Sequence, residues 1–185
     1  GGLGTVQSDL KQSAAAVASF ETAAKRLEDL LAHDTDDERL KLQLALVLNN
    51  WAGEQVNKRP GEAARLHGLA VELLRKLAVA DGANVRVQRD LGLSLNNLGA
   101  ALARSGEPQR ARQMYGEAIG IRSELVKAAP ARAAYKVDLA VSWNNLGILE
   151  NREGDRSAAE AAFDQSIELY RPLAERLAGN AAIQS

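Results

Sequence analysis

The sequence contains no cysteine and only four prolines among its 185 residues. Without cysteine there is no disulfide, no thiolate nucleophile and no cysteine-ligated metal. With so little proline, most of the chain is free to form long helices. Aromatic residues make up only 4% of the sequence, whereas apolar residues make up 46%, and this composition favours closely packed helices.

A charge excess of one sign and long apolar runs are also missing. The formal net charge is -1, so the chain lacks the basic surface expected of a protein that binds nucleic acid or an anionic membrane. No apolar run approaches the roughly 18 residues needed to span a bilayer. We therefore expect no nucleic-acid partner, no membrane partner and, because the absence of cysteine fits an intracellular protein, a cytoplasmic location.

Motifs of catalysis and metal binding are absent too. There is no GxxxxGK[ST], GxSxG or HExxH motif, and neither His33 nor His67 has a catalytic partner. Three acidic residues resemble the start of a calcium loop, namely Asp34, Asp36 and Glu38. However, Arg39 stands where that loop requires glycine, and Ala45 stands where its closing glutamate belongs. We therefore expect no enzymatic activity, no cofactor and no metal site.

One pattern occurs three times in the chain. Two consecutive asparagines lie between large apolar residues in the segments 48–51, 95–98 and 143–146, which are separated by 47 and then 48 residues. A bulky ring recurs in the same register, at Phe20, His67, Tyr115 and Phe163. A fixed period of this size indicates stacked repeats.

Each copy of the repeat is predicted to be a pair of helices. Apolar and small residues follow helical spacing in a first helix, at Leu91, Leu95, Leu98, Gly99 and Leu102, and in a second helix, at Ala111, Tyr115, Ala118, Ile121 and Leu125. Turn sequences separate the two helices at 58–61, 105–108 and 153–155, and linkers separate the copies at 34–38, 81–84 and 129–131.

These signals predict a single array over residues 1–185. We expect a partial repeat at 1–35 and complete repeats at 36–83, 84–131 and 132–185. Leu3-Gly4 stands 17 residues before Phe20, as Leu98-Gly99 stands before Tyr115. The chain is therefore expected to begin with a truncated first helix and to be part of a longer array. Pro172 is expected to kink or break the last helix.

The repeat resembles that of the tetratricopeptide repeat family. The signature of that family is present in one copy at Trp143, Asn145-Leu146-Gly147, Gly154, Ala159, Phe163 and Ser166. A second copy has it at Leu95, Asn97-Leu98-Gly99, Gly106, Ala111, Tyr115 and Ala118. The copy with Asn50-Trp51-Ala52, Ala63, His67 and Ala70 lacks the turn glycine. The family's usual period is about 34 residues, so this chain resembles a long-period bacterial variety, whose arrays are often attached to signalling kinases or NTPase modules.

The resemblance implies an all-α, right-handed α-solenoid of antiparallel helix hairpins, with about seven full helices plus a truncated N-terminal stub. It also implies a protein-protein interaction scaffold that holds a peptide or a partner domain on the concave face formed by the first helices. Chaperone-binding members use a lysine at the position of Asn49, Asn96 and Asn144 to grip a C-terminal carboxylate. That carboxylate clamp is absent here, so the tail of a chaperone is not the expected ligand.

The asparagine pairs are the candidate peptide-binding residues, and they are Asn49, Asn50, Asn96, Asn97, Asn144 and Asn145. At about 100° per residue, the two members of a pair bracket the helix face turned away from the core, and an amide both donates to and accepts from a peptide backbone. Arg104 and Arg152, near the ends of two first helices, are expected to favour an acidic partner.

Two alternatives remain open at the level of sequence. The asparagine pairs can be a structural feature of the repeat instead of a binding site. The array can equally be a structural spacer or an oligomerisation arm of a larger signalling protein, which self-associates through the apolar faces at the ends of its repeats.

Overall fold

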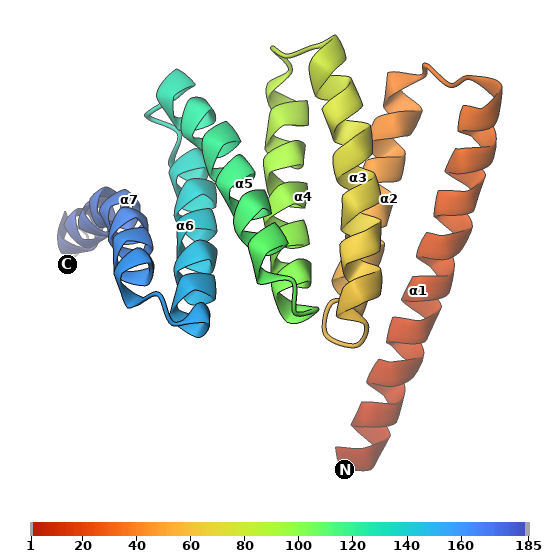
Figure 1. Ribbon diagram of the computed structural model, residues 1–185, viewed down its shortest axis with the longest axis horizontal. Helices are drawn as coiled ribbons and strands as arrows, with labels where there is room; N and C mark the ends of the chain where they lie inside the picture. The colour runs from red at the N-terminus through yellow and green to blue at the C-terminus, as the bar shows by residue number, and fades with distance from the viewer. Residues whose placement is uncertain (1, 184–185) are drawn as a thin grey trace.

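The computed structural model describes residues 2–183, with the side chains of residues 14–172 and 174–175. Within this range the chain forms seven α-helices and no strand: α1 (Gly2–His33), α2 (Glu38–Gln55), α3 (Pro60–Ala80), α4 (Val85–Arg104), α5 (Pro108–Ala128), α6 (Ala133–Glu153) and α7 (Arg156–Ile183). Figure 1 shows them side by side in chain order, with the two termini at opposite ends of the row. Each helix packs on the next one in sequence, and α4 also contacts α6. The predicted all-α solenoid is confirmed.

The ends of the helices follow from local sequence. The side chain of Asp37 caps α2, because its Oδ1 accepts hydrogen bonds from the backbone N–H groups of Arg39 and Leu40 at 2.8 and 3.1 Å. Pro60 and Pro108 begin α3 and α5, where the missing N–H of proline costs nothing. Each predicted turn and linker overlaps the break between two of these helices.

A glycine opposite a ring sets the distance between the two helices of a hairpin. A Cβ atom on Gly99 would lie 2.8 Å from the ring of Tyr115, and one on Gly147 would lie 2.7 Å from the ring of Phe163. Because neither glycine has a Cβ atom, α4 and α5 on one side, and α6 and α7 on the other, approach closely. In the hairpin of α2 and α3, the fully buried Ala52 takes the register position of the glycine, and the smaller imidazole of His67 takes that of the ring.

The structure differs from the sequence expectation at both ends of the array. No separate stub precedes the partial repeat, because α1 runs as one helix from Gly2 to His33. The reason lies in its sequence, since the register positions of Gly106 and Pro108 hold Lys11 and Ser13, which do not favour a turn. At the other end α7 continues through Pro172 and Gly179 to Ile183. The helix therefore is not broken, although its later part runs in a different direction from its start in Figure 1.

Replacing Gly99 with alanine is predicted to destabilise the fold by about 1–3 kcal/mol, because the new methyl group would overlap the buried ring of Tyr115. Gly116 is the matched control, since it lies in the helix α5 and nothing lies within 4 Å of the Cβ that alanine would add there. The Gly116→Ala variant should gain about 0.5–1 kcal/mol from helix propensity. Urea unfolding of both variants measures the difference, and equal stabilities would contradict the packing argument.

His67 is predicted to make the stability of the fold depend on pH. Burial lowers the pKa of His67 to about 4, whereas an unfolded chain has a histidine pKa of about 6.5. The unfolded state therefore binds more protons between these values, so stability is full above about pH 6.5 and falls by up to about 3 kcal/mol as the pH drops towards 4. Urea unfolding at pH 7 and pH 4.5 checks this, and a His67→Gln variant with the same pH dependence as the wild type would refute it.

Candidate functional site

The first helices of neighbouring repeats lie side by side in register. Arg89 of α4 and Asp138 of α6 form an ion pair at 3.8 Å. Near the other end of the same two helices, Nη1 of Arg152 donates a hydrogen bond to the carbonyl oxygen of Ala103 at 3.4 Å. Both contacts join residues that are 49 positions apart, close to the period of 48, so α6 runs beside α4 in nearly the repeat register.

One face of α4 and α6 points away from the core. Its residues follow helical spacing and are exposed or partly exposed. We define the α4–α6 face by Arg86, Arg89, Leu93, Asn97, Ala100 and Arg104 of α4, and by Val137, Val141, Asn144, Asn145, Ile148 and Arg152 of α6. This face is apolar near its middle and carries arginines towards both ends.

The first asparagine of a pair connects one repeat to the next. Nδ2 of Asn49 in α2 donates to Oγ of Ser94 in α4 at 2.6 Å, and that hydroxyl donates to the carbonyl oxygen of Asp90 at 2.8 Å. Oδ1 of Asn49 lies 2.8 Å from Nδ1 of His67 in α3. The amide of Asn49 is therefore bonded to two neighbouring helices, α3 and α4.

Asn96 occupies the same position one repeat later. It is only 5% exposed, and its Oδ1 accepts hydrogen bonds from Oγ of Ser142 at 3.3 Å and from Nδ2 of Asn145 at 3.1 Å. Ser142 is the counterpart of Ser94, so the bond between repeats recurs with the same partners. Asn49 and Asn96 are therefore both turned towards the next first helix. Asn144, which has no such helix beyond it in the described chain, is exposed.

The remaining candidate residues stay accessible. Asn50 is exposed, and Asn97 and Asn145 are partly exposed. Arg104 and Arg152 are exposed, and neither forms an ion pair with any residue that the structure describes. Five of the eight candidates predicted from the sequence therefore lie on the α4–α6 face: Asn97, Asn144, Asn145, Arg104 and Arg152.

Sequence reasoning missed the apolar part of this face. Leu93, Val141 and Ile148 are large hydrophobic residues that are exposed to solvent. A signal was present in the repeat register, because Leu93 and Val141 stand 48 residues apart and off the core stripe. An apolar residue repeated at a surface position indicates a contact surface.

Two further searches concern metals and membranes. Among the residues that the structure describes, no three His, Asp or Glu side chains are grouped so that they could hold a metal ion. The described helices also include none that is long and apolar enough to cross a membrane.

Comparison with known proteins gives two family matches. Residues 91–129 and residues 140–172 each match a model described as tetratricopeptide repeat. No curated protein matches the chain. Among solved structures, the crystal structure of MamA is 14% identical with a TM-score of 0.40, over 85% of this chain and 92% of that one. The crystal structure of BtubC (BKLC) from P. vanneervenii is 15% identical with a TM-score of 0.25, over 87% of this chain and 92% of that one.

Replacing Asn96 with alanine is predicted to cost about 1–3 kcal/mol of stability, because it leaves the buried hydroxyl of Ser142 without an acceptor and cuts a link between α4 and α6. Asn144 is the matched control, since it occupies the same repeat position but is exposed. The Asn144→Ala variant should stay within about 0.5 kcal/mol of the wild type. Thermal unfolding of the two variants compares them, and similar melting temperatures would show that the first asparagine is not a structural link.

Proposed function

Because this chain is a tetratricopeptide repeat protein, we propose that it is an interaction scaffold that holds a segment of a partner protein on the α4–α6 face. The observation that carries the proposal is the exposed apolar centre of that face. Leu93 of α4 and its repeat counterpart Val141 of α6 are both exposed, and so is Ile148, two turns further along α6. Large apolar side chains exposed on adjacent helices are typical of surfaces that another protein covers.

The asparagine amides supply the directional part of recognition. Asn97 and Asn145 are partly exposed next to the apolar centre, and each can offer both a donor and an acceptor to the backbone of a bound segment. Asn144 adds an exposed amide on α6. Backbone recognition of this kind tolerates different side chains in the partner.

Arg104 and Arg152 give the face its charge preference. They are counterparts in successive repeats, lie at the same end of α4 and α6, and form no ion pair within the described part of the chain. An acidic side chain of the partner would receive charge-assisted hydrogen bonds from both. The proposed partner segment is therefore apolar in its middle and acidic at one end.

The relative size of these contributions decides which residues matter most. Each amide hydrogen bond contributes about 0.5–1.5 kcal/mol net, and an exposed ion pair contributes at most about 1 kcal/mol. Burying an apolar side chain such as leucine contributes about 1.5–3 kcal/mol. Affinity should therefore depend mainly on the three apolar residues, and the asparagines and arginines should set orientation and selectivity.

A second candidate function is a structural spacer or oligomerisation arm of a larger signalling protein. The outer side of α7 favours it, because Ile119 of α5 is 8% exposed whereas its counterpart Ile167 of α7 is 54% exposed. Tyr170, also on α7, is exposed as well. In this alternative the uncovered side of α7 packs against another copy of the chain.

Replacing both Leu93 and Val141 with serine is predicted to weaken partner binding at least about tenfold without unfolding the chain, because two exposed side chains lose their contacts with the partner. Peptides selected from a random display library on the immobilised chain provide the ligands, and fluorescence titration gives their affinities. Val79→Ser in α3 is the matched control, since Val79 is exposed but lies off the face.

The outcomes separate the two functions. Peptides that bind the double variant as tightly as the wild type would place the binding surface elsewhere. If no peptide is selected and light scattering shows association that depends on concentration and is abolished by Ile167→Asp, the oligomerisation arm is the better explanation. Asn97→Ala combined with Asn145→Ala should weaken binding by a smaller factor than the double serine variant.

A further inference from the structure

One junction of the array departs from the residue pattern of its neighbours. Where α4, α5 and α6 meet, the repeat positions of Leu42 and Leu74 hold Arg89 and Arg122. The position of Val87 holds Tyr135. Side chains that form the apolar core between the earlier repeats are therefore replaced here by two cations and a phenol.

The same junction lacks the usual helix cap. Asp37 and Asn84 cap α2 and α4 with their side chains, whereas the equivalent residue before α6 is Arg132, which makes no capping bond. A cation at the N-terminus of a helix also opposes the helix dipole. The start of α6 therefore lacks a stabilising cap at the position where Arg132 adds a third guanidinium group to the junction.

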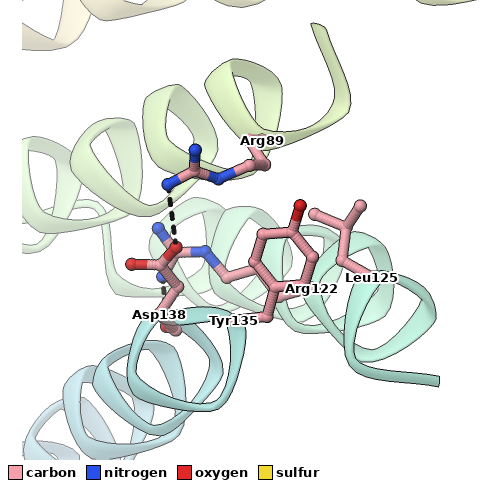
Figure 2. Close-up of a pocket in the computed structure, with 5 residues that line it drawn as sticks. All are labelled: Arg89, Arg122, Leu125, Tyr135 and Asp138. Atoms are coloured by element: carbon pink, nitrogen blue, oxygen red, sulfur yellow. Dashed lines mark hydrogen bonds and ion pairs between the residues drawn. The ribbon is translucent and has the colours of Figure 1, made fainter. Parts of the chain in front are cut away.

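Figure 2 shows how Arg89 from α4, Arg122 from α5, and Tyr135 and Asp138 from α6 line one shallow pocket. The guanidinium carbons of Arg89 and Arg132 lie 5.5 and 5.3 Å from the centre of the Tyr135 ring. Nη1 of Arg132 also donates to the hydroxyl of Tyr135 at 2.8 Å. The ring of Tyr135 therefore holds two guanidinium groups close to the pocket.

Arg122 is the buried member of this cluster, and it is only 4% exposed. Its Nη1 donates to the carbonyl oxygen of Asp138 at 2.5 Å and to Oγ of Ser142 at 2.6 Å. Both of these bonds come from Nη1, and no carboxylate among the described residues forms an ion pair with Arg122. A guanidinium that stays charged while buried requires a counter-charge or further acceptors.

The chain makes room for this arginine. A Cβ atom on Gly92 of α4 would lie 3.3 Å from Cγ of Arg122, and the counterparts of Gly92 in the other repeats are Ala45 and Ala140. The loss of one methyl group thus accompanies the change from leucine to arginine. The two departures from the pattern belong to one local arrangement.

The balance of charge at the junction is positive. Asp138 is the only carboxylate on the pocket, and it is 3.8 Å from Arg89. Asp90 lies nearby but pairs with Arg86 at 3.9 Å. Arg122 and Arg132 therefore remain without a carboxylate partner among the described residues. The side chain of Arg89 is 47% exposed, so a ligand can reach the Arg89 side of the cluster from solvent.

We propose that the junction of α4, α5 and α6 is an oxyanion-binding subsite, in which Arg89, Arg122 and Arg132 receive a carboxylate or phosphate group. The subsite lies at the end of the α4–α6 face opposite to Arg104 and Arg152. Its connection to a bound protein segment rests on the proposed function. An acidic or phosphorylated side chain of that segment would then be held here, about 22 Å from the Arg104 end at a rise of 1.5 Å per residue of α4.

The test uses small anions as probes, so that it does not depend on the partner. Thermal unfolding of the full chain is followed at pH 7 in sodium phosphate, in sodium acetate and in sodium chloride of equal ionic strength. A bound anion at ten times its dissociation constant should raise the melting temperature by about 3–6 °C relative to chloride. Phosphate, acetate or both can produce the rise, and the comparison identifies which oxyanion the subsite prefers.

Arg122→Leu is the decisive variant, because it restores the residue that the preceding repeat has at this position. A buried charge replaced by an apolar side chain of fitting size leaves a fold intact or stabilises it. The variant should melt normally in chloride and lose the saturable rise in phosphate or acetate. The general stabilising effect of phosphate on folded proteins acts equally on variant and wild type, so it cancels in the comparison.

Arg89→Gln keeps the proposal falsifiable if Arg122→Leu does not fold, because Arg89 is partly exposed. Arg89→Gln should weaken the affinity for the anion at least about tenfold. The control Arg75→Gln, which removes an exposed arginine paired with Glu117 in α5, should leave that affinity unchanged. An anion effect that is equal in Arg89→Gln and wild type, or absent with both anions, overturns the subsite. Either result would leave the proposed binding of a partner on the α4–α6 face untouched, because that proposal is tested separately with the Leu93 and Val141 variant.

Discussion

The contact between a ring and a bare backbone position sets the spacing of two hairpins, α4 with α5 and α6 with α7. Tyr115 and Phe163 lie where Gly99 and Gly147 have no Cβ atom, so the two helices of a unit approach to a distance that any larger residue would prevent. Stacking depends on this spacing, because the second helix must also present its other side to the next first helix. The rest of the array follows from the repetition of one close contact.

Neighbouring units are joined by a small polar link as well as by apolar packing. An asparagine amide of one first helix meets a serine hydroxyl of the next, as Asn49 meets Ser94 and Asn96 meets Ser142. These bonds are directional, so they fix how far one first helix slides along the next, which apolar contacts alone would leave less well defined. The second member of each asparagine pair remains exposed or partly exposed.

Most of the fold could be predicted from the sequence, and the candidate site only in part. Spacing of apolar residues, turn glycines and the period of 47 or 48 residues determined the helices, since these signals are local or repeated. The roles of Asn49 and Asn96 could not be predicted, because an amide near the edge of a helix face is turned inwards or outwards by what the neighbouring repeat offers it. The continuous helix α1 was missed because the expected stub rested on register alone, although Lys11 and Ser13 carry no turn signal.

The hairpin of α2 and α3 satisfies the ring contact in a different way, with the fully buried Ala52 and the imidazole of His67 in place of a glycine and a six-membered ring. Only one order of single substitutions converts one version into the other. Enlarging the ring first would force it into the methyl group of Ala52, whereas removing that methyl group first leaves only a small void. The order of the two substitutions is therefore constrained, and each change of ring size has to pass through an intermediate with glycine and a small ring.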